Sequence, residues 1–210
     1  MTKLQLALDG TLADSLRILE QIRRYIDIAE IGTPLILREG VRALHVVRER
    51  FPDLPLLADF KIMDAGTEEA AIAFEAGASI VTVMGFAQDA TLSGVVTAAA
   101  HYGGEVMVDL MQYPDPAKRI HECMAMGCDY YCVHTAHDVR RRDSPVEMLR
   151  SLRFAMPDAA LAVAGGINLN SIDAVVSVHP AVIVVGSAIT RADDPAAIAR
   201  TLSDRIKGDA

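Results

Sequence analysis

Short apolar runs of strand length recur eight times along this 210-residue chain, and this repetition limits the possible folds more than any other feature. Helix-length segments separate the runs, and Gly77, Gly103, Gly127 and Pro157 stand where those helices would end. The eight predicted strands lie near 4–9, 26–32, 54–60, 79–85, 105–111, 130–136, 160–165 and 181–187. Regular alternation of this kind predicts an α/β fold in which residues 1–210 form a single (β/α)8 TIM barrel domain.

The connecting segments and the composition support this interpretation. Hydrophobic residues make up 51% of the chain but aromatics only 5%, so the core must consist of small aliphatic side chains, as in parallel sheets covered by helices. An open doubly wound sheet is the alternative fold, but no G-x-G-x-x-G loop follows the first strand. The predicted helices include Asp14 to Tyr25, Glu39 to Phe51 behind Pro34, Glu68 to Ala76, Thr91 to His101, Ala117 to Met126 and Pro195 to Ile206.

Charge and cysteine usage exclude several classes of function. The formal net charge of −8 disfavours nucleic acid or an anionic membrane surface as a partner. The first nine residues do not resemble a signal peptide, and no apolar run approaches the ~20 residues of a membrane span. Cys123, Cys128 and Cys132 lack the close pairing of a zinc site, so we expect reduced, structural thiols in a cytoplasmic protein.

The segment Asp59-Phe60-Lys61-Ile62-Met63-Asp64 carries the strongest chemical signal. It follows the apolar run 54–58, and alternation along a strand places Asp59 and Lys61 on one face. Burying opposite charges at a strand end is costly unless they meet each other, a metal or a charged ligand. A purely structural ion pair is the plain alternative. Asp64 follows where the chain must turn into a loop.

The other predicted strands also end in polar residues or glycine. In a barrel these carboxyl ends converge on the face where such folds place their active sites. A lone aspartate at a strand end is more often a helix cap, but six such groups at matching positions are hard to explain as caps. The strand-end residues are Asp9, Glu30, Asp59 with Lys61, Gly85, Asp109, His134, Gly165-Gly166 and Gly186-Ser187.

Three of these side chains suggest specific chemistry. Glu30 and Asp59 end adjacent strands, and two close carboxylates either share a proton or bind a cation, with oxygen ligands suited to Mg²⁺ or Mn²⁺. His134 is a candidate proton acceptor, unless a helix cap or Asp138 simply satisfies it. His134 and His137 have the spacing of half a zinc site, but no third nitrogen or sulfur ligand is apparent.

The last two strands end in glycine turns, Gly165-Gly166 and Gly186-Ser187. Glycine allows backbone N–H groups to approach an anion, and the loops after strands seven and eight of barrels often bind phosphate. The alternative is that these glycines only join strand to helix. Arg191 could add charge to a phosphate site, whereas Arg140-Arg141-Arg142 is typical of a solvated loop.

Over nearly its whole length the chain resembles the 3-hexulose-6-phosphate synthases of the orotidine-5′-phosphate decarboxylase suprafamily. The D-x-K-x-x-D pattern of residues 59–64 is typical of the suprafamily, and residues 30–33 and 164–167 indicate its metal-dependent branch. The resemblance is carried by the segments 4–9, 27–34, 58–66, 108–109, 133–135, 162–167 and 184–190.

A close relative in that branch, 3-keto-L-gulonate-6-phosphate decarboxylase, is the first alternative. The decarboxylase has arginine at the position of His137, glutamate at that of Asp109 and arginine at that of Ser187. All three differences favour the synthase for this chain. Orotidine-5′-phosphate decarboxylase fits less well because it needs neither a metal nor the Glu30 carboxylate. A barrel that binds a sugar phosphate without turning it over is an alternative of another class.

The resemblance implies an aldol condensation of formaldehyde with D-ribulose 5-phosphate through a 1,2-enediolate, giving D-arabino-hex-3-ulose 6-phosphate. Glu30 and Asp59 would hold Mg²⁺, with Mn²⁺ as a substitute. His134 would take the C1 proton and Lys61 would stabilise the developing charge. The implied substrate-binding residues are Asp9, Asp109, Gly165, Gly166, Gly186 and Ser187. It also implies a homodimer in which Asp64 reaches the neighbouring subunit's site, making each site composite.

Overall fold

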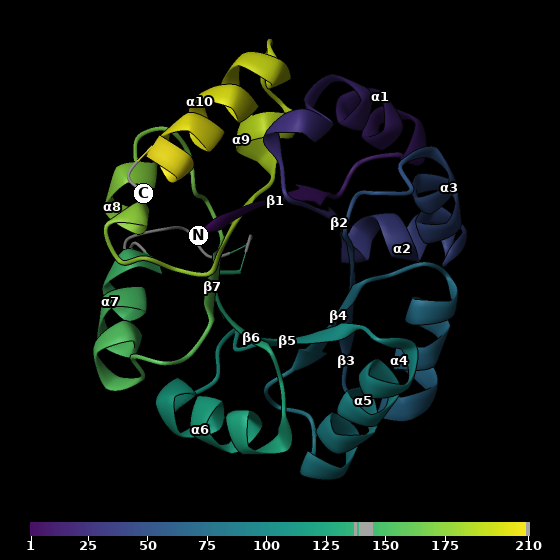
Figure 1. Cartoon of the computed structure of the whole chain (residues 1–210), viewed down its shortest axis with the longest axis vertical. Coiled ribbons are helices and arrows are strands. Elements are labelled where there is room, and N and C mark those ends of the chain that lie inside the picture. The colour runs from purple at the N-terminus through teal and green to yellow at the C-terminus, as the bar shows by residue number, and fades with distance from the viewer. Residues whose placement is uncertain (137, 139–144, 209–210) are drawn as a thin grey trace.

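The predicted barrel is confirmed: eight parallel strands form a closed barrel in chain order, with β1 hydrogen-bonded to both β2 and β8. The computed structural model describes residues 1–136, 138 and 145–208. Figure 1 shows the described helices as a ring outside the barrel. The strands are β1 (Lys3–Leu8), β2 (Ile28–Ile31), β3 (Leu56–Ile62), β4 (Ile80–Met84), β5 (Glu105–Asp109), β6 (Tyr130–His134), β7 (Leu161–Ala164) and β8 (Val182–Val185).

Two helices end at glycines that the sequence marks as helix ends. Gly103 and Gly127 adopt left-handed conformations at the ends of α5 and α6, which only a residue without Cβ adopts at little cost. The helices are α1 (Leu12–Ile22), α2 (Thr33–Glu39), α3 (Arg42–Arg50), α4 (Gly66–Glu75), α5 (Asp89–Tyr102), α6 (Pro116–Met126), α7 (Pro145–Ala155), α8 (Ile172–Val176), α9 (Ser187–Thr190) and α10 (Pro195–Gly208), and a 3-10 turn spans Arg23–Tyr25.

Two predicted helices have different boundaries in the structure. The single helix expected from Glu39 to Phe51 is wrong, because α2 already begins at Thr33 with Pro34 in its first turn, where proline is favoured. Gly40, at φ 62°, ends α2, and α3 starts afterwards at Arg42. The helix expected over 14–25 begins at Leu12 and gives way to the 3-10 turn at Arg23.

Strand β3 is shifted by two residues towards the carboxyl end relative to the predicted run 54–60, and it is less regular. It continues to Ile62, and its register with β4 shifts between Ala58 and Ile62. Lys61 lies within this irregularity with a φ of 48°, an unfavourable conformation for a side chain of this kind that costs about 1–3 kcal/mol. The main-chain N–H of Lys61 donates to Thr82 Oγ1 at 2.9 Å. The bulge thus places Lys61 over the barrel's interior.

Apolar packing fills the barrel interior up to the level at which the polar residues begin. Small and medium side chains dominate this inner layer, consistent with the composition: Ile28, Leu57, Ile80, Met107, Tyr130, Cys132, Ala162, Ala164, Val182 and Val184. A second, larger cluster fills the space between the strands and the helices. The three cysteines are buried and free, as expected. Among the described residues, no helix is long and apolar enough to cross a membrane.

Candidate active site

The carboxyl ends of the strands surround a cavity of about 700 Å³. Its wall includes residues from the loops after β1, β6, β7 and β8 as well as from the strands themselves. All but one of the predicted site residues line it: Asp9, Glu30, Asp59, Lys61, Asp109, His134, Gly165, Gly166, Gly186 and Ser187. The exception is Asp64. The expected convergence of the strand ends is therefore confirmed for these residues.

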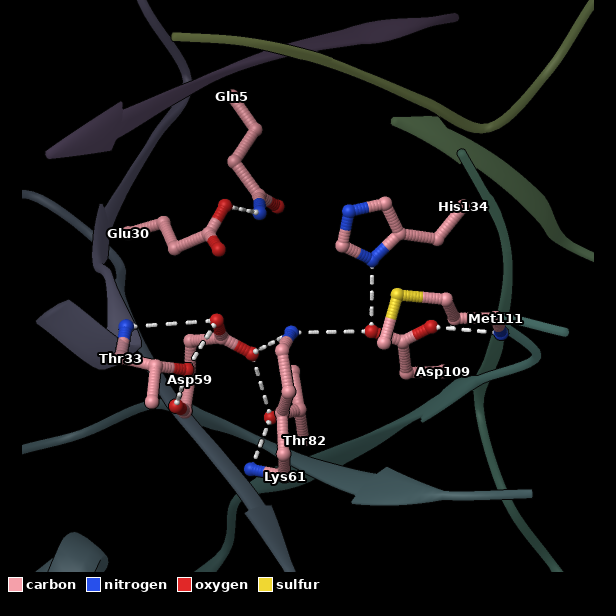
Figure 2. A network of polar contacts seen from close by, with 9 residues as sticks. All are labelled: Gln5, Glu30, Thr33, Asp59, Lys61, Thr82, Asp109, Met111 and His134. Carbon is pink, nitrogen blue, oxygen red and sulfur yellow. Dashed lines mark hydrogen bonds and ion pairs between the residues drawn. The ribbon is translucent and has the colours of Figure 1, made fainter. Parts of the chain in front are cut away.

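Two threonine hydroxyl groups hold Asp59, one from α2 and one from β4. Thr33, at the start of α2, donates through Oγ1 to Asp59 Oδ2 at 2.7 Å and also to the Asp59 main-chain oxygen at 2.7 Å. Thr82, on β4, donates to Asp59 Oδ1 at 2.9 Å. Only 6% of Asp59 is exposed, so these contacts fix the carboxylate in one orientation at the centre of the site (Figure 2).

Lys61 bridges two carboxylates across the cavity floor. Its Nζ lies 2.9 Å from Asp59 Oδ1 and 3.0 Å from Asp109 Oδ2 (Figure 2). Burial alone would lower the pKa of Lys61, but the two carboxylates outweigh burial and raise the pKa above its usual value. Lys61 is therefore an ammonium at neutral pH, and it contributes positive charge rather than a basic nitrogen.

Asp109 also contacts His134, whose Nδ1 lies 2.8 Å from Asp109 Oδ2. Burial would raise the pKa of Asp109, but the hydrogen bond and charge of His134, together with Lys61, lower it to about 2. An ionised Asp109 can only accept, so Nδ1 of His134 carries the hydrogen, and in a neutral ring the other nitrogen is then the acceptor. Figure 2 shows that second nitrogen pointing away from Asp109. The partner of His134 is thus Asp109 rather than a helix cap.

Glu30 extends from β2 into the same cavity. Gln5 donates through Nε2 to Glu30 Oε2 at 2.7 Å, and the other Glu30 oxygen faces Asp59 (Figure 2). Burial and the nearby negative charge of Asp59 raise the pKa of Glu30 to about 8. Two carboxylates that resist being ionised together are a suitable partial ligand set for a hard divalent cation, which would leave room for water and substrate oxygens. Among the described residues, however, no group of three or more His, Cys, Asp or Glu side chains has the arrangement of a complete metal site.

The glycine turns follow β7 and β8 at the carboxyl ends of these strands. Gly165 has a φ of 103°, and a Cβ there would collide with the main-chain oxygen of Thr135, so no other residue fits. Gly186 precedes α9, and Ser187 is the first residue of that helix. Arg191 also lines the cavity beside them. Accessible backbone N–H groups next to the guanidinium group of Arg191 are a suitable surface for a phosphate group.

Asp64 lies outside its own chain's cavity. The side chain is exposed, and its Oδ1 accepts the main-chain N–H of Ala65 at 2.8 Å. The structure of one chain therefore does not bring Asp64 to the other predicted residues. His137 and Arg140–Arg142 fall outside the described residues, while Asp138 lies at the cavity wall.

Sequence reasoning missed three polar residues of the contact network in Figure 2: Gln5, Thr33 and Thr82. A signal existed for two of them. Strand alternation places Gln5 on the same face as Asp9, and Thr82 is the one hydroxyl residue inside the apolar run 80–84. Thr33 had no such signal, because its role depends on how α2 packs against β3. Polar residues at inward-facing strand positions deserve the same weight as those at strand ends.

Comparison with known proteins agrees with this geometry. Residues 2–202 match the model of the Orotidine 5′-phosphate decarboxylase / HUMPS family. A 3-hexulose-6-phosphate synthase of Bacillus subtilis is 39% identical, covering 97% of this chain and 98% of the relative. The crystal structure of 3-hexulose-6-phosphate synthase from Salmonella typhimurium superimposes with a TM-score of 0.96 at 37% identity, covering 100% of both chains. That of 3-keto-L-gulonate-6-phosphate decarboxylase from Vibrio cholerae gives 0.84 at 25% identity, covering 99% and 98%.

Proposed function

The chain belongs to the Orotidine 5′-phosphate decarboxylase / HUMPS family, and we propose that it is a 3-hexulose-6-phosphate synthase, joining formaldehyde to D-ribulose 5-phosphate. Relatives named as synthases share 36–39% identity with it, against 25% for a relative named as a decarboxylase. The observation in the structure that supports this reaction best is the continuous chain of contacts from His134 through Asp109 and Lys61 to Asp59.

The first step is removal of a proton from C1 of the sugar, next to the C2 carbonyl. The acceptor nitrogen of His134 takes this proton, because Asp109 holds the ring with Nδ1 protonated. Lys61 is unsuitable as the base because its raised pKa keeps it protonated. Asp109 also stabilises the imidazolium that results, in the manner of the carboxylate in a catalytic triad.

Loss of the C1 proton leaves a 1,2-enediolate, whose negative charge needs stabilisation. Lys61 provides a fixed positive charge that is already oriented by two carboxylates, so no reorganisation is required as the charge develops. A divalent cation, Mg²⁺ or Mn²⁺, held by Glu30 and Asp59 would supply Lewis-acid stabilisation of the same charge. Burial of Glu30 and the nearby negative charge of Asp59 both raise the pKa of Glu30, and a cation between the two carboxylates would offset both effects.

The second step forms the new carbon–carbon bond. The C1 carbon of the enediolate attacks the carbon of formaldehyde, the C2 carbonyl re-forms, and the formaldehyde oxygen takes up the proton that His134 had removed. The product is D-arabino-hex-3-ulose 6-phosphate, and no proton is gained or lost overall. The phosphate at the far end of the sugar would rest on Gly165, Gly166, Gly186 and Ser187, with Asp9 near the hydroxyl groups.

One assay tests this function against its alternatives. Purified protein with Mg²⁺, D-ribulose 5-phosphate and formaldehyde should consume formaldehyde and form the hexulose phosphate. The same protein with 3-keto-L-gulonate 6-phosphate should release little CO₂. Chelation with EDTA should abolish the synthase activity, and Mg²⁺ or Mn²⁺ should restore it. Rapid CO₂ release without formaldehyde consumption would favour the decarboxylase, and binding without turnover would favour a non-catalytic sugar-phosphate barrel.

We also propose that the active protein is a homodimer with composite sites, to which each subunit contributes Asp64. The exposed position of this carboxylate, beyond the end of β3 and outside its own cavity, supports the proposal. In a C2 dimer of one Lys61→Ala and one Asp64→Ala subunit, one site has both defects and the other has none.

Mixing these two inactive variants under conditions of subunit exchange should therefore restore about a quarter of wild-type activity. Differently tagged subunits establish that mixed dimers form. If mixed dimers form and remain inactive, Asp64 serves its own chain or none.

A further inference from the structure

Gln5 is a buried polar residue in the cavity that the proposed mechanism does not use. It lies in the middle of β1, is 1% exposed and lines the cavity. Its side chain points into the barrel, towards Glu30 (Figure 2). Glutamine is rarely fully buried without a specific partner, so its presence here requires an explanation.

Among the residues that the structure describes, the side-chain amide of Gln5 has one hydrogen-bond partner, and this partner fixes its orientation. Nε2 donates to Glu30 Oε2 at 2.7 Å, so the N–H side of the amide faces Glu30 and Oε1 faces away from it. One Glu30 oxygen is thereby occupied. Figure 2 shows that the remaining Glu30 oxygen faces Asp59.

The other end of the amide argues against a purely structural role. Gln5 Oε1 is buried and has no hydrogen-bond partner among the residues that the structure describes. A buried acceptor without a donor destabilises the fold, so an apolar side chain would serve packing better. The protein itself provides such a case, because Met107 lies at the matching place on β5.

The match between Gln5 and Met107 follows from the strand register. Gln5 pairs with Ile28, the first residue of β2, and Met107 pairs with Tyr130, the first residue of β6. Both side chains line the cavity. The barrel thus accepts methionine at this level.

We propose that Gln5 is a positioning residue for Glu30, holding one carboxylate oxygen so that the other is presented together with Asp59 to a divalent cation. The proposal rests on the proposed function for the identity of the cation site, but it concerns cation affinity rather than turnover. Ligand-orienting partners of this kind typically contribute a factor of about 10–100 in metal affinity.

The experiment measures Mn²⁺ binding by electron paramagnetic resonance in the absence of any substrate. Gln5→Met should raise the dissociation constant for Mn²⁺ by about 10–100-fold relative to wild type. The matched control is Ser203→Ala, which also removes a buried polar group but lies on α10, outside the cavity. We expect this control to bind Mn²⁺ like wild type.

A folded Gln5→Met protein with wild-type Mn²⁺ affinity would overturn the proposal, as would a wild-type protein that binds no Mn²⁺. If Gln5→Met does not fold, Gln5→Asn provides the same test, because its amide is one methylene too short to reach Glu30. If wild type binds Mn²⁺ but consumes no formaldehyde, the proposed function fails while the comparison of affinities still decides the role of Gln5.

Discussion

The two halves of the barrel, β1–β4 and β5–β8, are built alike at the amino ends of their strands. In the first half the main-chain N–H of Leu4 donates to Asp27 Oδ2 at 2.8 Å. In the second, the N–H of Val106 donates to Asp129 Oδ2 at 2.8 Å. Each aspartate immediately precedes the next strand and ties it to the one before.

A second pair of contacts repeats in the same way. Arg48, on α3, donates to the main-chain oxygens of Pro52, Leu54 and Gly77. Arg153, on α7, donates to those of Pro157, Ala159 and His179. Arg48 thus connects α3 to the segment before β3 and to the turn before β4. Arg153 connects α7 in the same way to the segment before β7 and to the turn before β8.

At the carboxyl ends the halves differ. Glu30, the third residue of β2, corresponds to Cys132 on β6, and Asp59, the fourth of β3, corresponds to Ala164 on β7. Conversely, Asp109 corresponds to Ala7. One face of the barrel thus serves stability and is nearly duplicated, whereas the other serves chemistry and is not.

The largest effect should follow a change at the carboxyl face. His134→Asn should lower the exchange of the C1 hydrogen of ribulose 5-phosphate with solvent deuterium by ~10²–10⁴-fold, because it removes the base. Binding of ribulose 5-phosphate, measured by calorimetry, should change far less. Wild-type exchange in this variant would assign the base to another residue.

At the amino face, loss of an arginine should reduce stability and leave catalysis intact. Arg48→Met should lower the free energy of unfolding by about 2–4 kcal/mol, because the main-chain oxygens of Pro52, Leu54 and Gly77 lose a charged donor. Arg153→Met should cost less, since Arg153 Nε has no partner among the described residues, whereas Arg48 Nε donates to Gly77. Urea denaturation measures both, and equal kcat values check that the site is unaffected. A large fall in kcat of the folded variants would break the division between the two faces.

Asp109 should make the stability of the protein depend on acid pH. Its pKa of about 2 lies below that of an unfolded aspartate, so it stabilises the fold above pH ~4, and this contribution disappears as the pH falls towards 2. The loss should be about 2 kcal/mol, seen as the difference between urea titrations of wild type and Asp109→Asn. The corresponding residue of the first half, Ala7, offers no such effect. Parallel stability curves for the two proteins between pH 4 and 2 would show that Asp109 is not held as described.

The smallest effects should come from the paired aspartates at the amino face. Asp27→Ala and Asp129→Ala each remove one hydrogen bond to a strand N–H, with an expected loss of ~1 kcal/mol. Asp27 also pairs with Lys207 at 3.0 Å, so Asp27→Ala should cost slightly more. Thermal unfolding measures the difference. Strongly unequal losses of stability in Asp27→Ala and Asp129→Ala would show that the two halves are not equivalent.

The contrast between the faces also explains what was predictable from the sequence. The barrel follows from the spacing of apolar runs, and residues such as Asp9 and His134 were identified because strand ends must converge. The bulge at Lys61 and the Asp109–His134 contact depend on packing across the barrel, which no local pattern encodes. The division between α2 and α3 was missed although Gly40 marks it. The roles of Asp64 and of the cation ligands remain predictions.

The most direct test of the proposed chemistry is proton NMR of D-ribulose 5-phosphate in D₂O with wild-type protein and Mg²⁺ but without formaldehyde. If His134, Asp109 and Lys61 form the enediolate as described, the C1 proton signal should disappear at a rate set by the protein concentration. Addition of formaldehyde should then convert the sugar to the hexulose phosphate. Formaldehyde consumption without any C1 exchange, or exchange at a different carbon, would contradict the account.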